Sequence, residues 1–171
     1  MALELLLIYR KDVMKIKRIL VAVNSPNGRD VSFERALALA RSSGAELYLL
    51  HAVPIDQPFS FLGAERLERM ADMRKRADDA GVRVQTVEQH GDAAEIIELH
   101  AKTRAADLIV MGAEARRGWR PYRSSVVERV IRRTKVPILV VPDAARNNDR
   151  ARLVIPSAVH RTSQIERQRA A

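Results

Sequence analysis

Residues 106–142 read ADLIVMGAEARRGWRPYRSSVVERVIRRTKVPILVVP. The apolar run at 108–111 ends at Gly112, and then come a basic loop, two serines, a short amphipathic segment and a second apolar run at 136–141. Strand, loop, helix and strand in this order predict a βαβ unit. The loop after the first strand of such a unit lies where α/β proteins hold anionic ligands, so the segment after Gly112 is the first candidate for a site.

The same alternation of strand and helix patterns extends through the preceding chain. Strands are expected at residues 18–23, 46–53, 82–87, 108–111 and 136–141. Helices are expected between Asp30, as N-cap, and Gly44, over residues 63–80 and 93–103, and before the last strand. This order predicts one α/β domain with a five-stranded parallel sheet and helices on both faces.

Two elements carry finer expectations. The strand at 82–87 alternates apolar and polar residues, which indicates a partly wet face and a place near a sheet edge. The helix at 63–80 places Leu67, Met70 and Arg74 along one stripe, with many charges on the other side.

Composition limits the class of protein. The chain has 171 residues, 47% of them hydrophobic and 4% aromatic, which is enough for one aliphatic core. It has no cysteine, which excludes disulfides and zinc–thiolate sites and fits a reducing compartment. The apolar run at 3–8 is too short to span a membrane and lacks the features of a secretory signal, so we expect a cytoplasmic protein and no membrane partner.

The net charge of +9 has two interpretations. A basic surface attracts nucleic acid, and it is also a common solvated surface; we favour the second interpretation without excluding the first. The charge is concentrated in residues 116–135 and after residue 146.

Three segments are expected. Residues 1–15 form an N-terminal extension, which is either a genuine element or a start placed too early. Residues 16–143 form the domain, and residues 144–171 form a basic, mobile C-terminal tail. The one apolar cluster of that tail, residues 153–155, is a candidate for docking.

Four stretches resemble the universal stress protein family and its UspA-like domain. They are KRILVAV at 17–23, ALALARSSGAELYLLHAV at 36–53, HGDAAEIIELHAKTRAADLIVMG at 90–112 and SSVVERVIRRTKVPILVVP at 124–142. The resemblance implies an adenine-nucleotide α-hydrolase-like fold with strand order 3-2-1-4-5. A ligand crevice is then expected where the first and fourth strands end.

The resemblance also implies a homodimer through the last strand, with Val136, Ile138 and Val140 at the interface. An apolar last strand bounded by prolines would otherwise leave an exposed sheet edge.

One branch of the family binds ATP through Gly, two residues, Gly, nine residues and then Gly-Ser or Gly-Thr. Gly112 matches the first position, whereas Ala115 replaces the second glycine and Ser124-Ser125 replaces the final pair, one residue early. An alanine in a left-handed turn costs about 1 kcal/mol. The pattern therefore indicates a degenerate phosphate site.

Other positions of the implied site differ as well. Asn24 stands where the ATP-binding branch has an aspartate, and Val53 matches the position that contacts adenine. Arg116 and Arg117, together with Arg120 and Arg123, supply charge that can hold phosphate. The alternative is a solvated loop with Trp119 and Tyr122 packed on a dimer partner.

No catalytic or metal-binding set is found in the sequence. Ser124 and Ser125 have no base nearby in sequence, and the Walker lysine is absent. His51, His90 and His100 lack metal-ligand spacing.

We therefore expect a non-catalytic stress-response binding module, a homodimer with a degenerate nucleotide site for which ATP is the cofactor considered. One alternative is an ATP-binding switch or slow ATPase of the same fold. The other is a basic nucleic-acid-associated protein.

Overall fold

The computed structural model describes residues 15–23, 30–55, 62–112, 125–142 and 152–156. The strands in these ranges are β1 (Arg18–Ala22), β2 (Glu46–Val53), β3 (Val84–His90), β4 (Leu108–Gly112), β5 (Ile138–Val141) and β6 (Arg152–Val154). The helices are α2 (Val31–Ser43), α3 (Leu62–Asp79), α4 (Ala93–Thr103) and α5 (Val126–Arg133). Within the described residues, no helix combines the length and the apolar character needed to cross a membrane.

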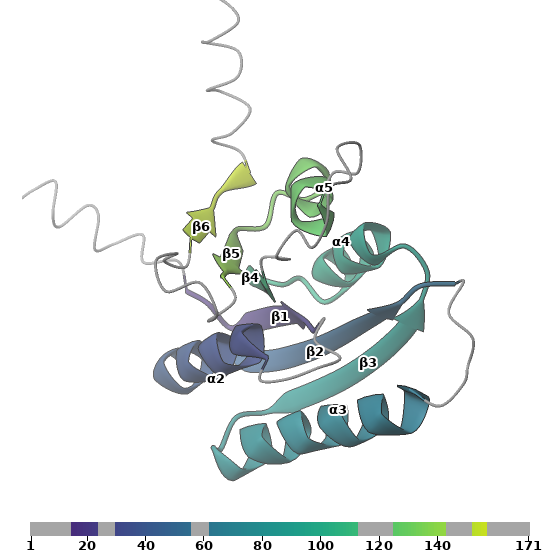
Figure 1. Ribbon diagram of the computed structural model, residues 1–171. Coiled ribbons are helices and arrows are strands. Elements are labelled where there is room, and N and C mark those ends of the chain that lie inside the picture. Colours follow the sequence, from purple (N-terminus) through teal and green to yellow (C-terminus); the bar gives the residue numbers. More distant parts are fainter. Residues whose placement is uncertain (1–14, 24–29, 56–61, 113–124, 143–151, 157–171) are drawn as a thin grey trace, which may run out of the picture.

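The strands form one sheet in the order β3-β2-β1-β4-β5-β6 (Figure 1). The pairs from β3 to β5 are all parallel, and β1 lies between β2 and β4. The expected order 3-2-1-4-5 is therefore confirmed, as is the place of β3 at an edge. Because the chain steps outward from β1 in both directions, the sheet has a switch point between β1 and β4.

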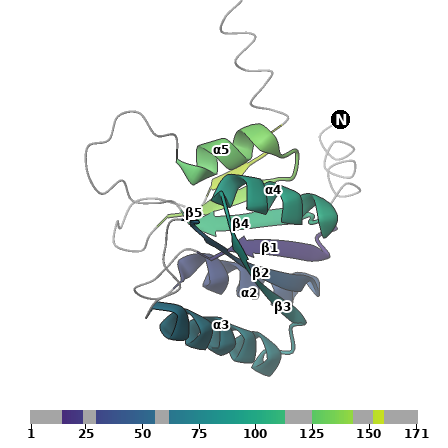
Figure 2. The ribbon, with the colours of Figure 1, turned by 90° about the vertical axis from the view of Figure 1, so that its right-hand side faces the viewer.

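Helices cover both faces of the sheet, as Figure 2 shows. Alternate residues of β1 point to opposite sides, with Ile19 and Val21 packing toward α2 and α3. Leu20 and Ala22 pack toward α4 and α5. The near-continuous apolar sequence of β1 thus follows from burial on both faces.

The expected helix ends are found at α2. The Asp30 carboxylate accepts a hydrogen bond from the backbone N–H of Phe33 at 3.0 Å, and Gly44 ends the helix with φ of 70°. Glycine adopts this left-handed conformation without a steric cost.

The predicted stripe of α3 is confirmed at Met70 and wrong at Leu67 and Arg74. Met70, Met73 and Ala77 are the residues buried against the sheet, whereas Leu67 is 63% exposed and Arg74 lies at the surface. The spacings 70, 73 and 77 make an equally regular helical face. The two candidate faces differ by about one residue, and single-sequence periodicity does not separate them.

The sixth strand is the main departure from the sequence-based fold. β6 pairs antiparallel with the outer edge of β5, which the sequence analysis expected to pair with a second copy of the chain. The apolar cluster at 153–155 supplies this strand, so part of the expected tail belongs to the sheet. The remaining residues of the tail lie outside the described residues.

The α3 packing makes a direct prediction about stability. Met70→Ala should lower the free energy of unfolding by about 2–5 kcal/mol, because it removes a buried side chain and leaves a cavity. Leu67→Ala, on the exposed side of the same helix, should change it by less than about 0.5 kcal/mol. Urea denaturation of both variants measures the difference, and equal losses would contradict the observed face of α3.

Candidate functional site

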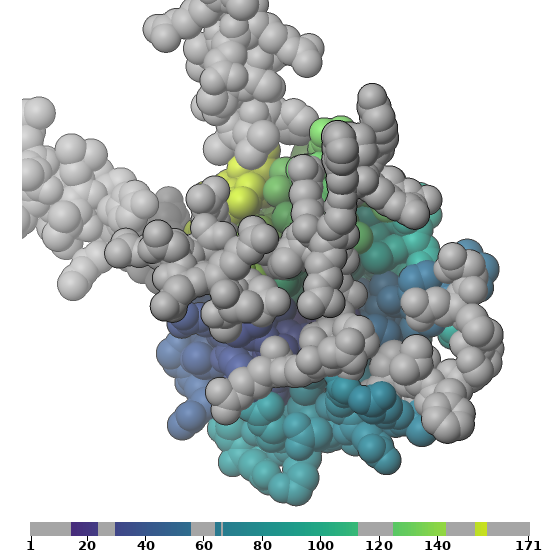
Figure 3. All heavy atoms as spheres, in the orientation of Figure 1, coloured from purple at the N-terminus to yellow at the C-terminus, as the bar shows by residue number. Residues whose placement is uncertain are grey.

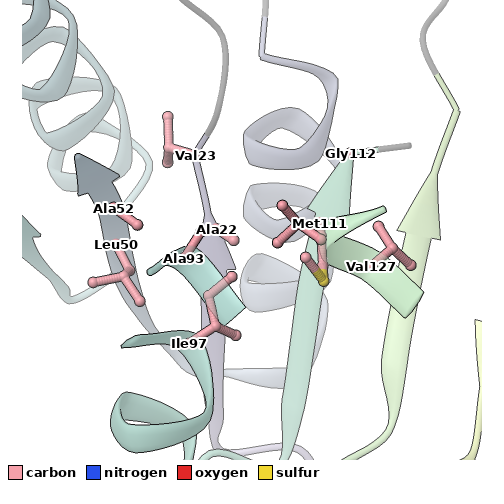
Figure 4. Close-up of a pocket in the computed structure, with 10 residues that line it drawn as sticks. Ala22, Val23, Leu50, Ala52, Ala93, Ile97, Met111, Gly112 and Val127 are labelled. Carbon is pink, nitrogen blue, oxygen red and sulfur yellow. The ribbon is translucent and has the colours of Figure 1, made fainter. Parts of the chain in front are cut away.

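A crevice opens where β1, β2 and β4 end (Figure 4). Its lining residues come from three strands and two helices: Ala22, Val23, Leu50, Ala52, Met111, Gly112, Ala93, Ile97, Val126 and Val127. The chain leaves β1 toward α2 on one face of the sheet, and after β4 it continues to α5 on the other face. Because these two connections run to opposite faces of the sheet, a gap remains between them at the switch point. This gap is the usual ligand position in open α/β sheets.

All the side chains that line this crevice are apolar. The cavity holds about 60 Å³, and the labelled side chains of Ala22, Leu50 and Met111 surround it in Figure 4. Small alanines on β1 and β2 keep the floor open. Such a slot suits the edge or face of a planar, weakly polar ring better than a charged group.

Two helices begin beside the slot. Ala93 is the first residue of α4, and Val126 and Val127 are the first two of α5. Backbone N–H groups at helix starts attract anions, and the effect adds to the helix dipole. The apolar floor is therefore bordered by positions that favour negative charge.

The carboxylate of Asp92 already offsets the positive potential at the first turn of α4. One oxygen of Asp92, Oδ1, accepts hydrogen bonds from the backbone N–H groups of Ala94 at 3.0 Å and Glu95 at 3.1 Å. By contrast, α5 is capped by the neutral hydroxyl of Ser125, which accepts from the N–H of Glu128 at 3.2 Å. Of the two helix starts, that of α5 keeps more of its positive potential.

An ion pair fixes α5 relative to α4. Arg129 donates to Asp92 Oδ1, and this hydrogen bond holds the pKa of the Asp92 carboxyl below its usual range. Burial opposes the shift, and the two backbone donors of α4 add to it. Farther along the helices, Arg133 pairs with Glu95 at 3.5 Å and with Glu98 at 2.6 Å. These contacts set the position of the α5 N-terminus over the slot.

His51 lies on β2 between Leu50 and Ala52, which line the crevice. Its ring Nδ1 donates to the carbonyl oxygen of Val23 at 3.0 Å, and Val23 directly follows β1. The N–H of Val23 donates in turn to the carbonyl of Leu50 at 2.9 Å. Together they extend the pairing of β1 and β2 up to the edge of the slot.

Gly112 stands at the end of β4 and lines the slot, as expected from the motif. A Cβ at this position would lie 3.3 Å from the hydroxyl oxygen of Ser32, a buried residue of α2. The glycine therefore lets β4 and α2 approach closely at the switch point.

The remaining predicted site residues separate into two groups. Ser125 lies at the mouth of the crevice as the N-cap of α5. Val53 lies at the end of β2 but is 1% exposed and is not part of the lining; Ala52, one residue earlier, faces the slot. Asn24, Ala115, Arg116, Arg117 and Ser124 lie outside the described residues.

Sequence reasoning missed most of the lining. Leu50, Ile97 and Met111 have no polar signature that separates them from core residues, and no local pattern signals that Asp92 pairs with Arg129. Over the described part of the chain, no group of three or more His, Cys, Asp or Glu residues could hold a metal ion.

Comparison with known proteins agrees with this geometry. A sequence profile described as the Universal stress protein family matches residues 15–142. The chain belongs to the universal stress protein family. A curated universal stress protein of Methanocaldococcus jannaschii is 34% identical over 132 residues, which cover 67% of this chain and 77% of that protein.

Solved universal stress proteins share the fold. One from Burkholderia pseudomallei is 28% identical, with a TM-score of 0.58, over 75% of this chain and 98% of that one. One from Archaeoglobus fulgidus, in complex with dAMP, is 20% identical, with a TM-score of 0.58, over 72% and 96%. Universal stress proteins with cAMP and with AMP bound align with TM-scores of 0.59 and 0.54.

The Asp92–Arg129 pair predicts a pH effect. Because the folded-state pKa of Asp92 lies below its unfolded value, the pair stabilises the fold above about pH 4 and its contribution is lost as pH falls through the folded pKa. Arg129→Met should raise that pKa and move acid unfolding to higher pH. Its cost at neutral pH should be about 0.5 kcal/mol, because both side chains are 37% exposed.

Arg132→Met is the matched control, since it removes the same charge from an exposed position of the same helix. Far-ultraviolet circular dichroism during acid titration gives the midpoints. Identical midpoints for the two variants would show that Arg129 does not hold the Asp92 carboxylate.

Proposed function

We propose that this protein is a stress-response module that binds an adenine nucleotide in the crevice between β1 and β4, without turning it over. The observation that carries the proposal is the apolar slot at the switch point, with two helix N-termini at its border. Universal stress proteins of the same fold have been solved with dAMP, cAMP and AMP, which supports this ligand class.

The slot explains why the base would supply most of the affinity. Adenine is planar and buries well among Ala22, Ala52 and Met111, where transfer of apolar area from water stabilises by about 25 cal/mol per Å². No charged side chain lines the described slot, so the ring faces no desolvation cost from a buried ion.

The phosphates would lie toward Gly112 and the start of α5. Ser125 and the first N–H groups of α5 offer donors there, and the sequence places Arg116 and Arg117 in the adjoining segment. Ala115 and Ser124 replace two glycines of the ATP-binding pattern, so contacts to the outer phosphates of a triphosphate should be weaker than in that branch.

A binding role fits the described residues better than hydrolysis. The lining contains no nucleophile and no acid or base, and Asp92 is held by Arg129 and two backbone donors. A general base must reach the proton that it removes. The homodimer and the cytoplasmic location expected from the sequence belong to the same proposal.

Binding through the slot predicts the effect of filling it. Ala52→Phe should weaken AMP binding by at least about tenfold, because the ring would occupy the space of the base. Isothermal titration calorimetry with AMP, dAMP, cAMP and ATP measures the affinities, and phosphate release tests for turnover.

Ala38→Phe is the control for this variant, since Ala38 is exposed on α2 away from the slot. It should bind AMP as the unaltered chain does. If Ala52→Phe keeps full affinity while remaining folded, the ligand does not occupy this slot, and steady phosphate release would contradict a module without turnover.

The degenerate motif makes a separate prediction. Ala115→Gly combined with Ser124→Gly should strengthen ATP binding by about tenfold and leave AMP binding nearly unchanged, because glycine permits the close backbone approach that cradling the outer phosphates requires. Titration of the double variant with both nucleotides provides the comparison. An equal gain for AMP and ATP, or none for either, would show that these positions do not limit triphosphate binding.

A further inference from the structure

The helices end and the strands begin at the same end of the domain. Each of α2, α3, α4 and α5 runs back from the end of one parallel strand to the start of the next, so all of them finish where the strands start (Figure 2). In the space-filling view, α2 and α3 lie side by side toward this end (Figure 3). The crevice opens at the opposite end, where β1, β2 and β4 finish.

Exposed cations gather where the strands begin. The last turns of α2, α4 and α5 each contain Lys or Arg, which offsets the negative potential of a helix C-terminus. The residues just before β1, β3 and β5 add cations that no helix end requires. We name the exposed set the basic end, and it comprises Lys17, Arg41, Arg83, Lys102, Arg132 and Lys135.

The cations of the basic end form no ion pair with any described residue. Acids close to them have other partners. Oδ2 of Asp107 accepts hydrogen bonds from the backbone N–H groups of Lys17 at 2.8 Å and Arg18 at 2.9 Å. Glu46 accepts from the hydroxyl of Tyr48 at 3.4 Å. These carboxylates satisfy groups of the fold and leave the cationic side chains unpaired.

The end of α3 does not cancel the surplus of positive charge. Its two acids pair within the helix, Asp79 with Lys75 at 2.7 Å and Asp78 with Arg74 at 3.9 Å. A helix C-terminus carries about −0.5 of an elementary charge, so the helix ends together offset only about two of the cations. The basic end therefore keeps a net positive charge.

The domain is polarised along the strand direction. The first turns of the same helices, toward the crevice end, are acidic and contain Glu34, Glu65, Glu95 and Glu128. Each helix dipole favours this arrangement, and because all the helices point the same way their preferences add to one polarity. The cations before the strands strengthen the positive side further.

We propose that the basic end binds the phosphate backbone of double-stranded DNA without reading its sequence. Its cations extend across the sheet from Arg83, before β3, to Lys135, before β5. Neighbouring strands lie about 4.8 Å apart, so the steps from β3 to β5 span about 19 Å. A duplex carries one phosphate charge per about 1.7 Å of its axis, so about eleven phosphates fall within that length. This surface is separate from the nucleotide crevice and adds a second partner.

The residues around these cations favour a duplex over other polyanions. Single-stranded nucleic acid stacks its bases on exposed aromatic rings, whereas Tyr48 near this end is 8% exposed and lies under the guanidinium of Arg104. Membrane surfaces bind cations together with large apolar side chains that insert, whereas the turns here present Gly44, Gly81 and Ala105. Long cations beside small residues suit the outer phosphates of a duplex.

Fluorescence anisotropy of the full chain with two labelled DNA duplexes of unrelated sequence tests the proposal at about 50 mM salt. The two affinities should agree within about threefold, and the logarithm of the affinity should fall linearly with the logarithm of the salt concentration. A single strand of the same length and vesicles of anionic lipid are the competitors. Tighter binding to either competitor, or a strong preference for one duplex, would overturn the assignment.

Neutral substitutions at the basic end locate the contact. Arg83→Gln combined with Lys102→Gln and Lys135→Gln removes exposed cations from α4 and from the turns before β3 and β5. Affinity for the duplex should fall by at least about tenfold, and the salt dependence should become shallower by about 0.9 for each lost phosphate contact.

The matched control lowers the net charge equally at exposed positions outside the basic end, by Ala38→Glu, Leu67→Glu and Leu99→Glu. It should keep the salt dependence of the unaltered chain, and circular dichroism checks that both variants fold. Equal losses in the two variants would show that net charge, and not this surface, determines binding. A folded variant of the basic end that binds the duplex as the unaltered chain does would also overturn the proposal.

The crevice provides an independent comparison. Saturating AMP should leave duplex binding unchanged, because the two surfaces lie at opposite ends of the sheet, and Ala52→Phe should bind the duplex as the unaltered chain does. Displacement of the duplex by AMP would place the DNA at the crevice and overturn the basic end as its site. Failure of AMP to bind would contradict the nucleotide proposal alone.

Discussion

The position of β1 between β2 and β4 is the constraint on which the site depends. Because the chain turns from β1 toward α2 and from β4 toward α5, the two connections part on opposite faces of the sheet. Parallel pairing aligns Ala22 with Met111, so small and flexible side chains meet at the point of separation. The crevice is a consequence of topology, and its apolar lining continues the core that holds α4 and α5 on the sheet.

Polar contacts around the crevice hold its walls in place. The ion pair of Asp92 and Arg129 holds the start of α4 against α5. The hydrogen bond from His51 to Val23 holds β2 against the residue that follows β1. These contacts are partly exposed and individually contribute little to stability. Their effect is geometric, since they fix the two helix starts and the strand ends that a nucleotide would touch.

The sequence patterns were sufficient to predict five parallel strands alternating with helices, because buried parallel strands and their helices follow regular patterns. The order of those strands in the sheet came from the family resemblance. The sequence analysis placed Gly112 at the crevice, and it named Val53, which is not among the lining residues, whereas its neighbour Ala52 is. Successive residues of a strand face opposite sides of the sheet. The slot residues Leu50 and Met111 resemble any core residue in the sequence. The pairing of β6 with β5 depends on contacts across ten intervening residues, which local patterns do not encode.

The central claim is that the apolar crevice receives the adenine ring. Amide chemical shifts of the isotope-labelled full chain, recorded during titration with AMP, test it most directly. The account predicts that the amides of Gly112, Ala93 and Val127 shift with one common affinity, while those of α3 remain unchanged. Shifts confined to α2 and α3, or no saturable shift at any of the three amides, would contradict it.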